Sequence, residues 1–349
     1  MKHNKELDFF KAVLIGLVIL VHIVNFGELH PSVKSSILAF MMPSFLVITG
    51  YLVNVNKSLR DFMLYLLKIA LPYVMAVMGY AVLSLYLPVR DGIQVLDAPT
   101  AIHILFFKPL GPYWFFHVMI VCGTIYYATF RLLRNADTTV KYSIFASLLV
   151  VVALFTPFLN IKSAVYYFIG VGVRQYANDF SRIYKKSWWP IFPFGLLISQ
   201  ASFHDWGSIS IIICVLSFFC FSAYFFSFLK GKGKSAVEYI GRNTLPIYVF
   251  HPIFTMLSKF ILPAFSFDAT GIAHACFHGR NRHRRQHRHR LADGLVPSLL
   301  AHRAQKNLKI AHDPLLTSRR CWTLPHAAGM EKLAALEKKG EKRAGLASN

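Results

Sequence analysis

Two histidines stand out because each lies within a long apolar segment. Residues 17–26 read LVILVHIVNF around His22, and residues 240–254 read IGRNTLPIYVFHPIF around His251. A titratable side chain is costly in hydrocarbon, so such a residue usually faces the interior of a helical bundle and often has a function. Imidazole exchanges protons near neutral pH, which suits general acid–base catalysis. We therefore predict that His22 and His251 are catalytic residues.

Both histidines also have a structural interpretation. His22 could be a hydrogen-bonded packing residue in a helix interface. His251 lies between Pro246 and Pro252, and a proline releases a backbone carbonyl that a nearby imidazole could cap. Residue type alone leaves these alternatives open.

The first apolar segment carries a line of polar residues, which favours a functional role for His22. Eleven residues separate Lys11 from His22, and this spacing returns a helix to within roughly 20° of its starting face. Asp8 and Asn25 extend the same line. A helix face that contacts lipid seldom carries a line of polar residues, so we expect this face to point into the bundle. Lys11 would then lie at a cationic entrance, with the imidazole of His22 about 16 Å deeper in the membrane.

The composition predicts that these residues lie on membrane helices. Of the 349 residues, 55% are hydrophobic, and a soluble globule has too little interior for that share. A helix of about 20 apolar residues crosses a bilayer. We predict an all-α, polytopic integral membrane bundle of about nine to ten transmembrane helices, with nine apolar segments at roughly 9–28, 35–54, 62–87, 112–132, 142–158, 164–178, 188–203, 207–229 and 244–265.

Basic residues alternate between successive loops and predict the orientation. If the amino terminus is cytoplasmic, the inner loops are richer in lysine and arginine than the outer loops, as the positive-inside rule requires. The inner loops then hold Lys57 and Arg60; Arg131, Arg134 and Lys141; Arg182, Lys185 and Lys186; and Lys230, Lys232, Lys234 and Arg242.

The composition changes near residue 270, which predicts two regions. Residues 1–270 hold 22 Lys and Arg against 11 Asp and Glu, whereas residues 271–349 hold 16 against 5. We interpret 1–270 as the transmembrane domain and 271–349 as a basic, His- and Arg-rich tail that is disordered or frame-shifted. The run from Arg280 to Arg290 has no interleaved aromatic residue, and no Cys or carboxylate is spaced to complete a metal site with His283, His287 and His289, so we expect neither nucleic-acid binding nor a metal site.

Five sequence features in order resemble the membrane-bound acyltransferase-3 family, and within it the O-acetyltransferases of sugars and exopolysaccharides. The resemblance covers about residues 5–270. The features are Asp8-x-x-Lys11 followed by His22, PSFLVITGYL at 43–52, the stretch from Arg60 through Lys68 to Pro72, YWFF at 113–116, and IGRNTLPIYVFHPIF at 240–254.

The resemblance implies an integral membrane O-acyltransferase of the bacterial inner membrane. Such an enzyme moves an acyl group, here expected to be acetyl, from cytoplasmic acyl-CoA to a hydroxyl of an envelope polysaccharide or lipid-linked sugar. His22 corresponds to the family's key histidine. Lys11 replaces the family's arginine, which keeps the charge but loses bidentate hydrogen bonding. Of the family's paired arginines, Lys68 fills one position and Tyr65 occupies the other.

We therefore predict that acyl-CoA is the co-substrate and that no metal is needed. Lys11, Arg60 and Lys68 are the predicted donor-binding residues, and Asn25, Tyr113 and Trp114 the predicted acceptor-binding residues. For Tyr113 and Trp114 the alternative is an interfacial aromatic belt.

Two other functions remain open from the sequence. The first is a transporter or flippase for a glycolipid or organic anion, with His22 and His251 coupling proton movement; the lack of internal repeats counts against it. The second is an inactive acyltransferase variant whose altered end leaves the bundle incomplete.

Overall fold

The computed structural model describes residues 4–87, 92–257 and 260, and within them every regular element is a helix. The predicted tail, with His283, His287 and His289, and the end of the ninth apolar segment lie outside the described residues. The longer helices are α1 (Lys5–His22), α3 (Pro31–Leu52), α4 (Leu59–Tyr86), α6 (Trp114–Leu132), α7 (Thr138–Phe155), α8 (Ile161–Gly172), α10 (Ile209–Phe228), α11 (Gly231–Arg242) and α12 (Thr244–Leu257).

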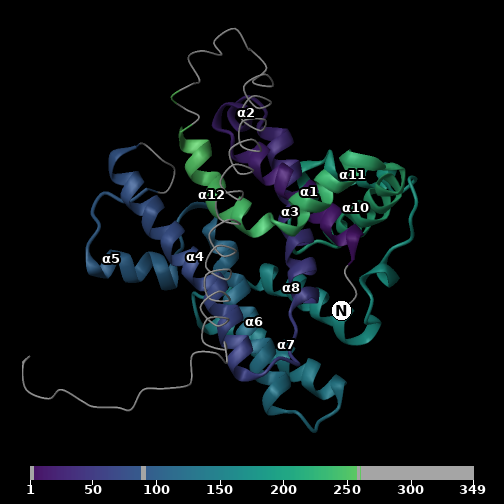
Figure 1. Cartoon of the computed structure of the whole chain (residues 1–349), viewed down its shortest axis with the longest axis horizontal. Coiled ribbons are helices and arrows are strands. Elements are labelled where there is room, and N and C mark those ends of the chain that lie inside the picture. The colour runs from purple at the N-terminus through teal and green to yellow at the C-terminus, as the bar shows by residue number, and fades with distance from the viewer. Residues whose placement is uncertain (1–3, 88–91, 258–259, 261–349) are drawn as a thin grey trace, which may run out of the picture. The chain divides into compact units, whose positions relative to one another are not determined.

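Shorter helices join them. These are α2 (Val24–Leu29), α5 (Ala98–Ile102) and α9 (Ile191–Ile198), the π-helices η1 (His103–Phe107) and η3 (Val173–Ala177), and the 3₁₀-helices η2 (Gly111–Tyr113), η4 (Phe180–Ile183) and η5 (Ala201–Phe203). Figure 1 shows α12 beside α1 and α4, and α12 contacts both of these helices as well as η2.

Five helical segments are long and apolar enough to cross a membrane: α3, α4, η2 with α6, α7 and α10. Helix α1 is 18 residues long but carries four charged residues in its first seven positions, and the described part of α12 has 14 residues. The prediction of an all-α membrane protein is confirmed at this level. The number of nine to ten transmembrane helices and the cytoplasmic amino terminus stay predictions.

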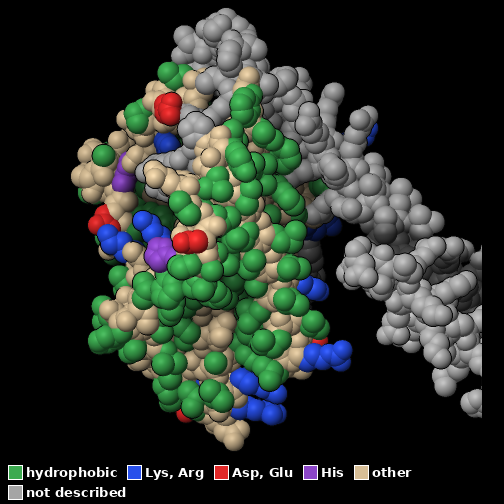
Figure 2. All heavy atoms as spheres, turned by 90° about the vertical axis from the view of Figure 1, so that its left-hand side faces the viewer, with side chains coloured by type: hydrophobic (Ala, Val, Ile, Leu, Met, Phe, Trp, Pro, Cys, Tyr) green, Lys and Arg blue, Asp and Glu red, His purple; other side chains and the backbone are tan. Residues whose placement is uncertain are grey.

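Helix α4 presents an apolar face to the surroundings. Leu64, Leu67, Leu71 and Met75 are each between 46% and 66% exposed. Figure 2, which views the molecule from the α4 and α5 side, shows hydrophobic side chains over much of this face. Contiguous apolar surface of this kind is rare on soluble monomers. We conclude that this face of α4 contacts lipid.

The first apolar segment is not one helix, which corrects the predicted polar line. The backbone is extended at Ile23 (φ −71°, ψ 109°), so α1 ends at His22 and Asn25 lies in the separate helix α2. The 100° rule extrapolates a face only while the backbone stays helical. The placement of Asn25 on the same helical line as His22 is therefore wrong.

Two further helical boundaries differ from the sequence interpretation. The seventh apolar segment, 188–203, contains only the eight-residue α9 and the 3₁₀-helix η5. Helix α11 was not predicted, because GKGKSAVEYIGR has a narrow apolar stripe rather than an apolar run. Such a helix gains its stability by packing one face on a neighbour, and α11 packs against α1.

Glycines allow two of the closest helix contacts. A Cβ atom on Gly50 of α3 would lie 2.2 Å from the carbonyl oxygen of Tyr167, and one on Gly170 of α8 would lie 2.1 Å from that of Val47. Where α11 meets α1, a Cβ on Gly241 would lie 1.8 Å from the carbonyl oxygen of Asp8. Small residues let membrane helices approach this closely, and they fix α3, α8, α1 and α11 relative to one another.

Candidate active site

The two histidines singled out by the sequence lie against each other. The ring centroids of His22 and His251 are 4.9 Å apart, and the rings meet edge to face at 76°. His22 is the last residue of α1 and is partly buried, whereas His251 lies within α12 and is 0% exposed. The packing of α12 on α1 therefore builds one two-imidazole site from opposite ends of the described chain (Figure 1).

Each imidazole is oriented by a backbone carbonyl of its own helix. Nδ1 of His22 donates to the carbonyl oxygen of Val18 at 2.7 Å, and Nδ1 of His251 donates to that of Tyr248 at 2.7 Å. A carbonyl can only accept, so in both neutral rings Nδ1 carries the hydrogen and Nε2 is the basic nitrogen. The site thus presents two imidazoles of defined tautomer.

Pro252 explains why the Tyr248 carbonyl is available. In a regular helix the N–H of residue 252 would donate to that oxygen, and proline has no N–H. His251 takes the place of the missing donor. The structural interpretation of His251 is therefore correct for Nδ1.

A pair of reciprocal hydrogen bonds holds α12 against the start of α6. The Tyr113 hydroxyl donates to the carbonyl oxygen of Val249 at 3.0 Å, and the Tyr248 hydroxyl donates to that of Pro112. Gly111 begins this GPY turn with a φ of +54°, a left-handed conformation that glycine adopts without strain. Tyr113 is 0% exposed, and its hydroxyl holds the backbone two residues before His251.

The predicted donor-binding residues do not gather at this site. Lys11 forms an ion pair with the buried Asp8, with 2.9 Å between Nζ and Oδ1. Arg60 and Lys68 are exposed on α4, and Lys68 shares its face with the exposed Leu64 and Leu71. Asn25 is partly buried in α2.

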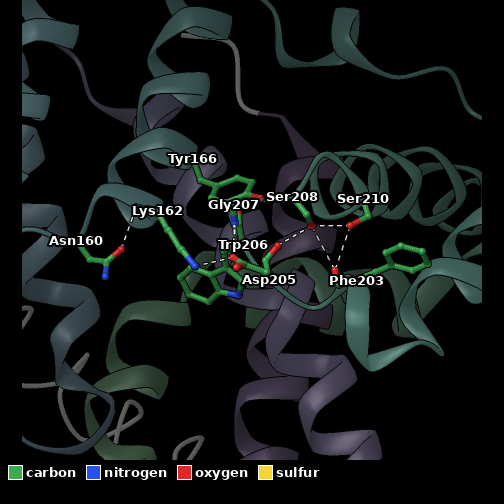
Figure 3. Close-up of polar contacts among 9 residues, drawn as sticks. All are labelled: Asn160, Lys162, Tyr166, Phe203, Asp205, Trp206, Gly207, Ser208 and Ser210. Atoms are coloured by element: carbon green, nitrogen blue, oxygen red, sulfur yellow. Dashed lines mark hydrogen bonds and ion pairs between the residues drawn. The ribbon is translucent and has the colours of Figure 1, made fainter.

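Trp114 is partly buried and packs near Trp206, with ring centroids 6.0 Å apart. Figure 3 shows the loop that carries Trp206. Lys162 Nζ lies 2.6 Å from Asp205 Oδ1, which also accepts from Gly207 N at 2.7 Å. These hydrogen bonds to the carboxylate hold the pKa of Asp205 below its usual range.

Further hydrogen bonds fix the same loop. The hydroxyl of Tyr166 donates to the carbonyl oxygen of Trp206 at 2.7 Å, and the hydroxyls of Ser208 and Ser210 donate to that of Phe203 at 3.4 and 3.1 Å (Figure 3). The loop therefore holds Trp206 beside Trp114, a partnership that sequence reasoning missed because DWG carries no regular pattern.

The family model of an acyltransferase domain matches residues 4–277 of the chain. This span includes both histidines, the GPY turn and the Trp114–Trp206 pair. The chain belongs to the acyltransferase-3 family. No curated protein and no solved structure matches the chain significantly.

Membership of the acyltransferase-3 family fits the residues brought together here. The family's chemistry is transfer of an acyl group, and an imidazole can act as the acid or base in such a transfer. Within the described ranges no group of three or more His, Cys, Asp or Glu residues is placed to hold a metal ion. Tyr248 was also missed from the sequence, although a tyrosine four residues before Pro252 is a signal that could have found it.

Proposed function

We propose that this membrane protein is an O-acyltransferase in the bacterial inner membrane. It transfers an acetyl group from cytoplasmic acyl-CoA to a hydroxyl of an envelope polysaccharide or lipid-linked sugar. The observation that carries the proposal is the His22–His251 pair, in which a hydrogen bond from Nδ1 to a backbone carbonyl orients each imidazole.

The proposed step is direct transfer with His22 as general base. Nε2 of His22 takes the proton of the acceptor hydroxyl while the hydroxyl oxygen attacks the thioester carbonyl carbon. The carbon–sulfur bond then breaks, and the imidazolium returns the proton to the leaving thiolate. The products are an O-acetyl ester and free coenzyme A.

The position of His22 supports this role. It is the last residue of α1, and the partial negative charge at a helix carboxyl end favours a cation by about 0.3–1 kcal/mol. This contribution offsets part of the cost of burying the imidazolium that forms during transfer. The ring of His251 packs against the ring of His22 and helps to orient it. His251 also shares the proton that His22 takes from the acceptor hydroxyl.

The two tryptophans support an acceptor site for a sugar. The apolar C–H faces of a sugar ring pack well against indole rings, and an indole N–H can donate to a hydroxyl. We assign Trp114 and Trp206 to acceptor binding. Tyr113, by contrast, acts on the reaction through its hold on α12.

The test is coenzyme A thiol release by the purified full-length protein in nanodiscs, with acetyl-CoA and a panel of envelope glycans. We expect release that depends on a glycan, with the acetyl ester detected by mass spectrometry. His22→Ala should reduce the rate about 10²- to 10⁴-fold, as loss of a general base does, and His251→Ala should also reduce it. His117→Ala is the matched control, since His117 is a partly buried histidine of α6 outside the pair. Full activity of His22→Ala would refute the assigned base.

A further inference from the structure

A cationic cavity of about 420 Å³ lies where the ends of four helices meet. Its walls come from the segment after α3, the end of α6, the start of α7 and the π-helix η3 that follows α8. The lining includes four cations, Arg131, Arg134, Lys141 and Arg174. A volume of this size is within the range of small-molecule sites in proteins.

The chain holds these side chains in a defined arrangement. The guanidinium of Arg174 lies 5.7 Å from the centre of the Tyr51 ring, over its face, and Lys141 Nζ donates to the carbonyl oxygen of Arg134 at 3.0 Å. Gln175, also in the lining, donates to the hydroxyl of Tyr126. The cavity is therefore built by packed side chains, and two of its cations are anchored within it.

The backbone of the lining is strained at one residue. Asn178 has a φ of +60°, and the N–H of Asp179 donates to the carbonyl oxygen of Ala177 across it at 2.7 Å. The Tyr51 hydroxyl donates to the Asn178 carbonyl at 3.2 Å. Such tight turns cost energy and persist where surrounding structure holds them, and this one places an amide side chain in the cavity wall beside the cations.

Among the described residues, no carboxylate pairs with the cations of this cavity, which are Arg131, Arg134, Lys141 and Arg174. Four cations around one cavity repel one another, and a bound polyanion would relieve this repulsion. An arginine guanidinium can donate two parallel hydrogen bonds to two oxygens of one phosphate group. The ligand that fits is therefore an organic phosphate with more than one charged group.

We propose that this cavity binds the phosphates at the nucleotide end of the acyl-CoA donor. The proposal rests on the proposed function and deepens it, because it moves donor binding from the residues expected from the sequence to a different site. Lys11 is paired with Asp8, and Arg60 and Lys68 are not in the lining. The cavity opens at the end of the bundle that carries the predicted cytoplasmic loops, where acyl-CoA is available.

The probe is adenosine 3′,5′-bisphosphate, which has the base, the 3′-phosphate and the first 5′-phosphate of coenzyme A and lacks the second 5′-phosphate and the thiol arm. Binding is measured by isothermal titration calorimetry on the full-length protein in phosphatidylcholine nanodiscs. We expect saturable binding that weakens with salt. Arg131→Gln and Arg174→Gln should each raise the Kd about tenfold or more, since each removes a charge-assisted hydrogen bond to phosphate.

Two matched variants separate binding from folding. Arg182→Gln removes an exposed cation of η4 that does not line the cavity, and it should change the Kd less than twofold. Arg131 is exposed, so its replacement leaves the packing of the helices intact. Arg174→Lys should give an intermediate Kd, because it keeps the charge and loses the fork.

The outcomes distinguish this inference from the proposed function. If the bisphosphate binds and the arginine variants lose that binding, the result supports the cavity as a phosphate site. If no acetyl transfer occurs in the same experiments, that result refutes only the proposed function. Acetyl transfer with an unchanged KM for acetyl-CoA in Arg131→Gln and Arg174→Gln overturns the cavity as donor site. Saturable binding of phosphatidylglycerol in place of the bisphosphate would assign the cavity to a lipid headgroup and also overturn the inference.

Discussion

At the scale of single residues, the site depends on what each polar atom is bonded to. His22 and His251 both use Nδ1 to donate to carbonyls of their own helices, so their tautomers are fixed before any substrate arrives. Pro252 is part of this arrangement, because it removes the donor that would otherwise occupy the Tyr248 carbonyl. A proline beside a buried histidine thus selects which nitrogen is basic.

The hydroxyl of Tyr113 gives a prediction at this scale. Tyr113→Phe removes its hydrogen bond to the Val249 carbonyl and should lower the free energy of unfolding by about 0.5–1.5 kcal/mol. Because α12 then holds His251 less firmly, we also expect kcat to fall while the KM for acetyl-CoA stays the same. Thermal denaturation and steady-state kinetics measure the two effects.

The control for this prediction is Tyr86→Phe, which alters a 79% exposed tyrosine at the end of α4. It should leave both quantities unchanged. If Tyr113→Phe raised only the KM for the acceptor, Tyr113 would contact the sugar directly, as the sequence analysis first expected.

At the scale of elements, close helix contacts decide where the site residues lie. The α3–α8 crossing depends on Gly50 and Gly170, whose missing side chains let backbone meet backbone. This crossing also sets the distance between the segment after α3 and η3, which together form walls of the cationic cavity. The contact of α11 with α1 at Gly241 holds the start of the helix that ends in His22.

Substitution of Gly170 tests the crossing. Gly170→Ala places a Cβ 2.1 Å from the Val47 carbonyl oxygen, so the helices must move apart, and we expect a loss of about 1–3 kcal/mol in the free energy of unfolding. Gly79→Ala is the matched control, because nothing lies within 4 Å of a Cβ at that position in α4. It should be neutral or stabilise the helix by up to about 1 kcal/mol. Equal thermal stability of the two variants would show that the crossing tolerates a side chain.

At the scale of the whole molecule, the distribution of charge predicts which end faces the cytoplasm. Arg131 in the last turn of α6 and Arg134 in the loop after it both contribute to the cationic cavity. The opposite end carries the Trp206 loop, where Lys162 is neutralised by Asp205. An acyl donor from the cytosol and a sugar acceptor from the other side would thus reach the protein from opposite faces.

Cysteine labelling tests this orientation. Asn135→Cys lies in the α6–α7 loop and Gln94→Cys in the loop before α5, and both positions are exposed. Intact spheroplasts are treated with a membrane-impermeant maleimide, and the labelling of each variant is compared with that of the parent protein. We expect labelling of Gln94→Cys in intact spheroplasts and of Asn135→Cys only after permeabilisation. The reverse pattern would place the cationic cavity on the side opposite the cytoplasm, where acyl-CoA could not reach it.

The sequence by itself determined the class of protein, the apolar helices and the choice of His22 and His251, because hydropathy and an unusual residue in an apolar run are local properties. It could not predict the break at Ile23, the packing of α11 or the pairing of the two histidines. Those depend on where backbones meet and which hydrogen bonds remain available after helices pack. Arg174 shows the difference plainly: in the sequence it lies within the predicted apolar segment 164–178, and only the tertiary structure places it in one cavity with three cations from other elements.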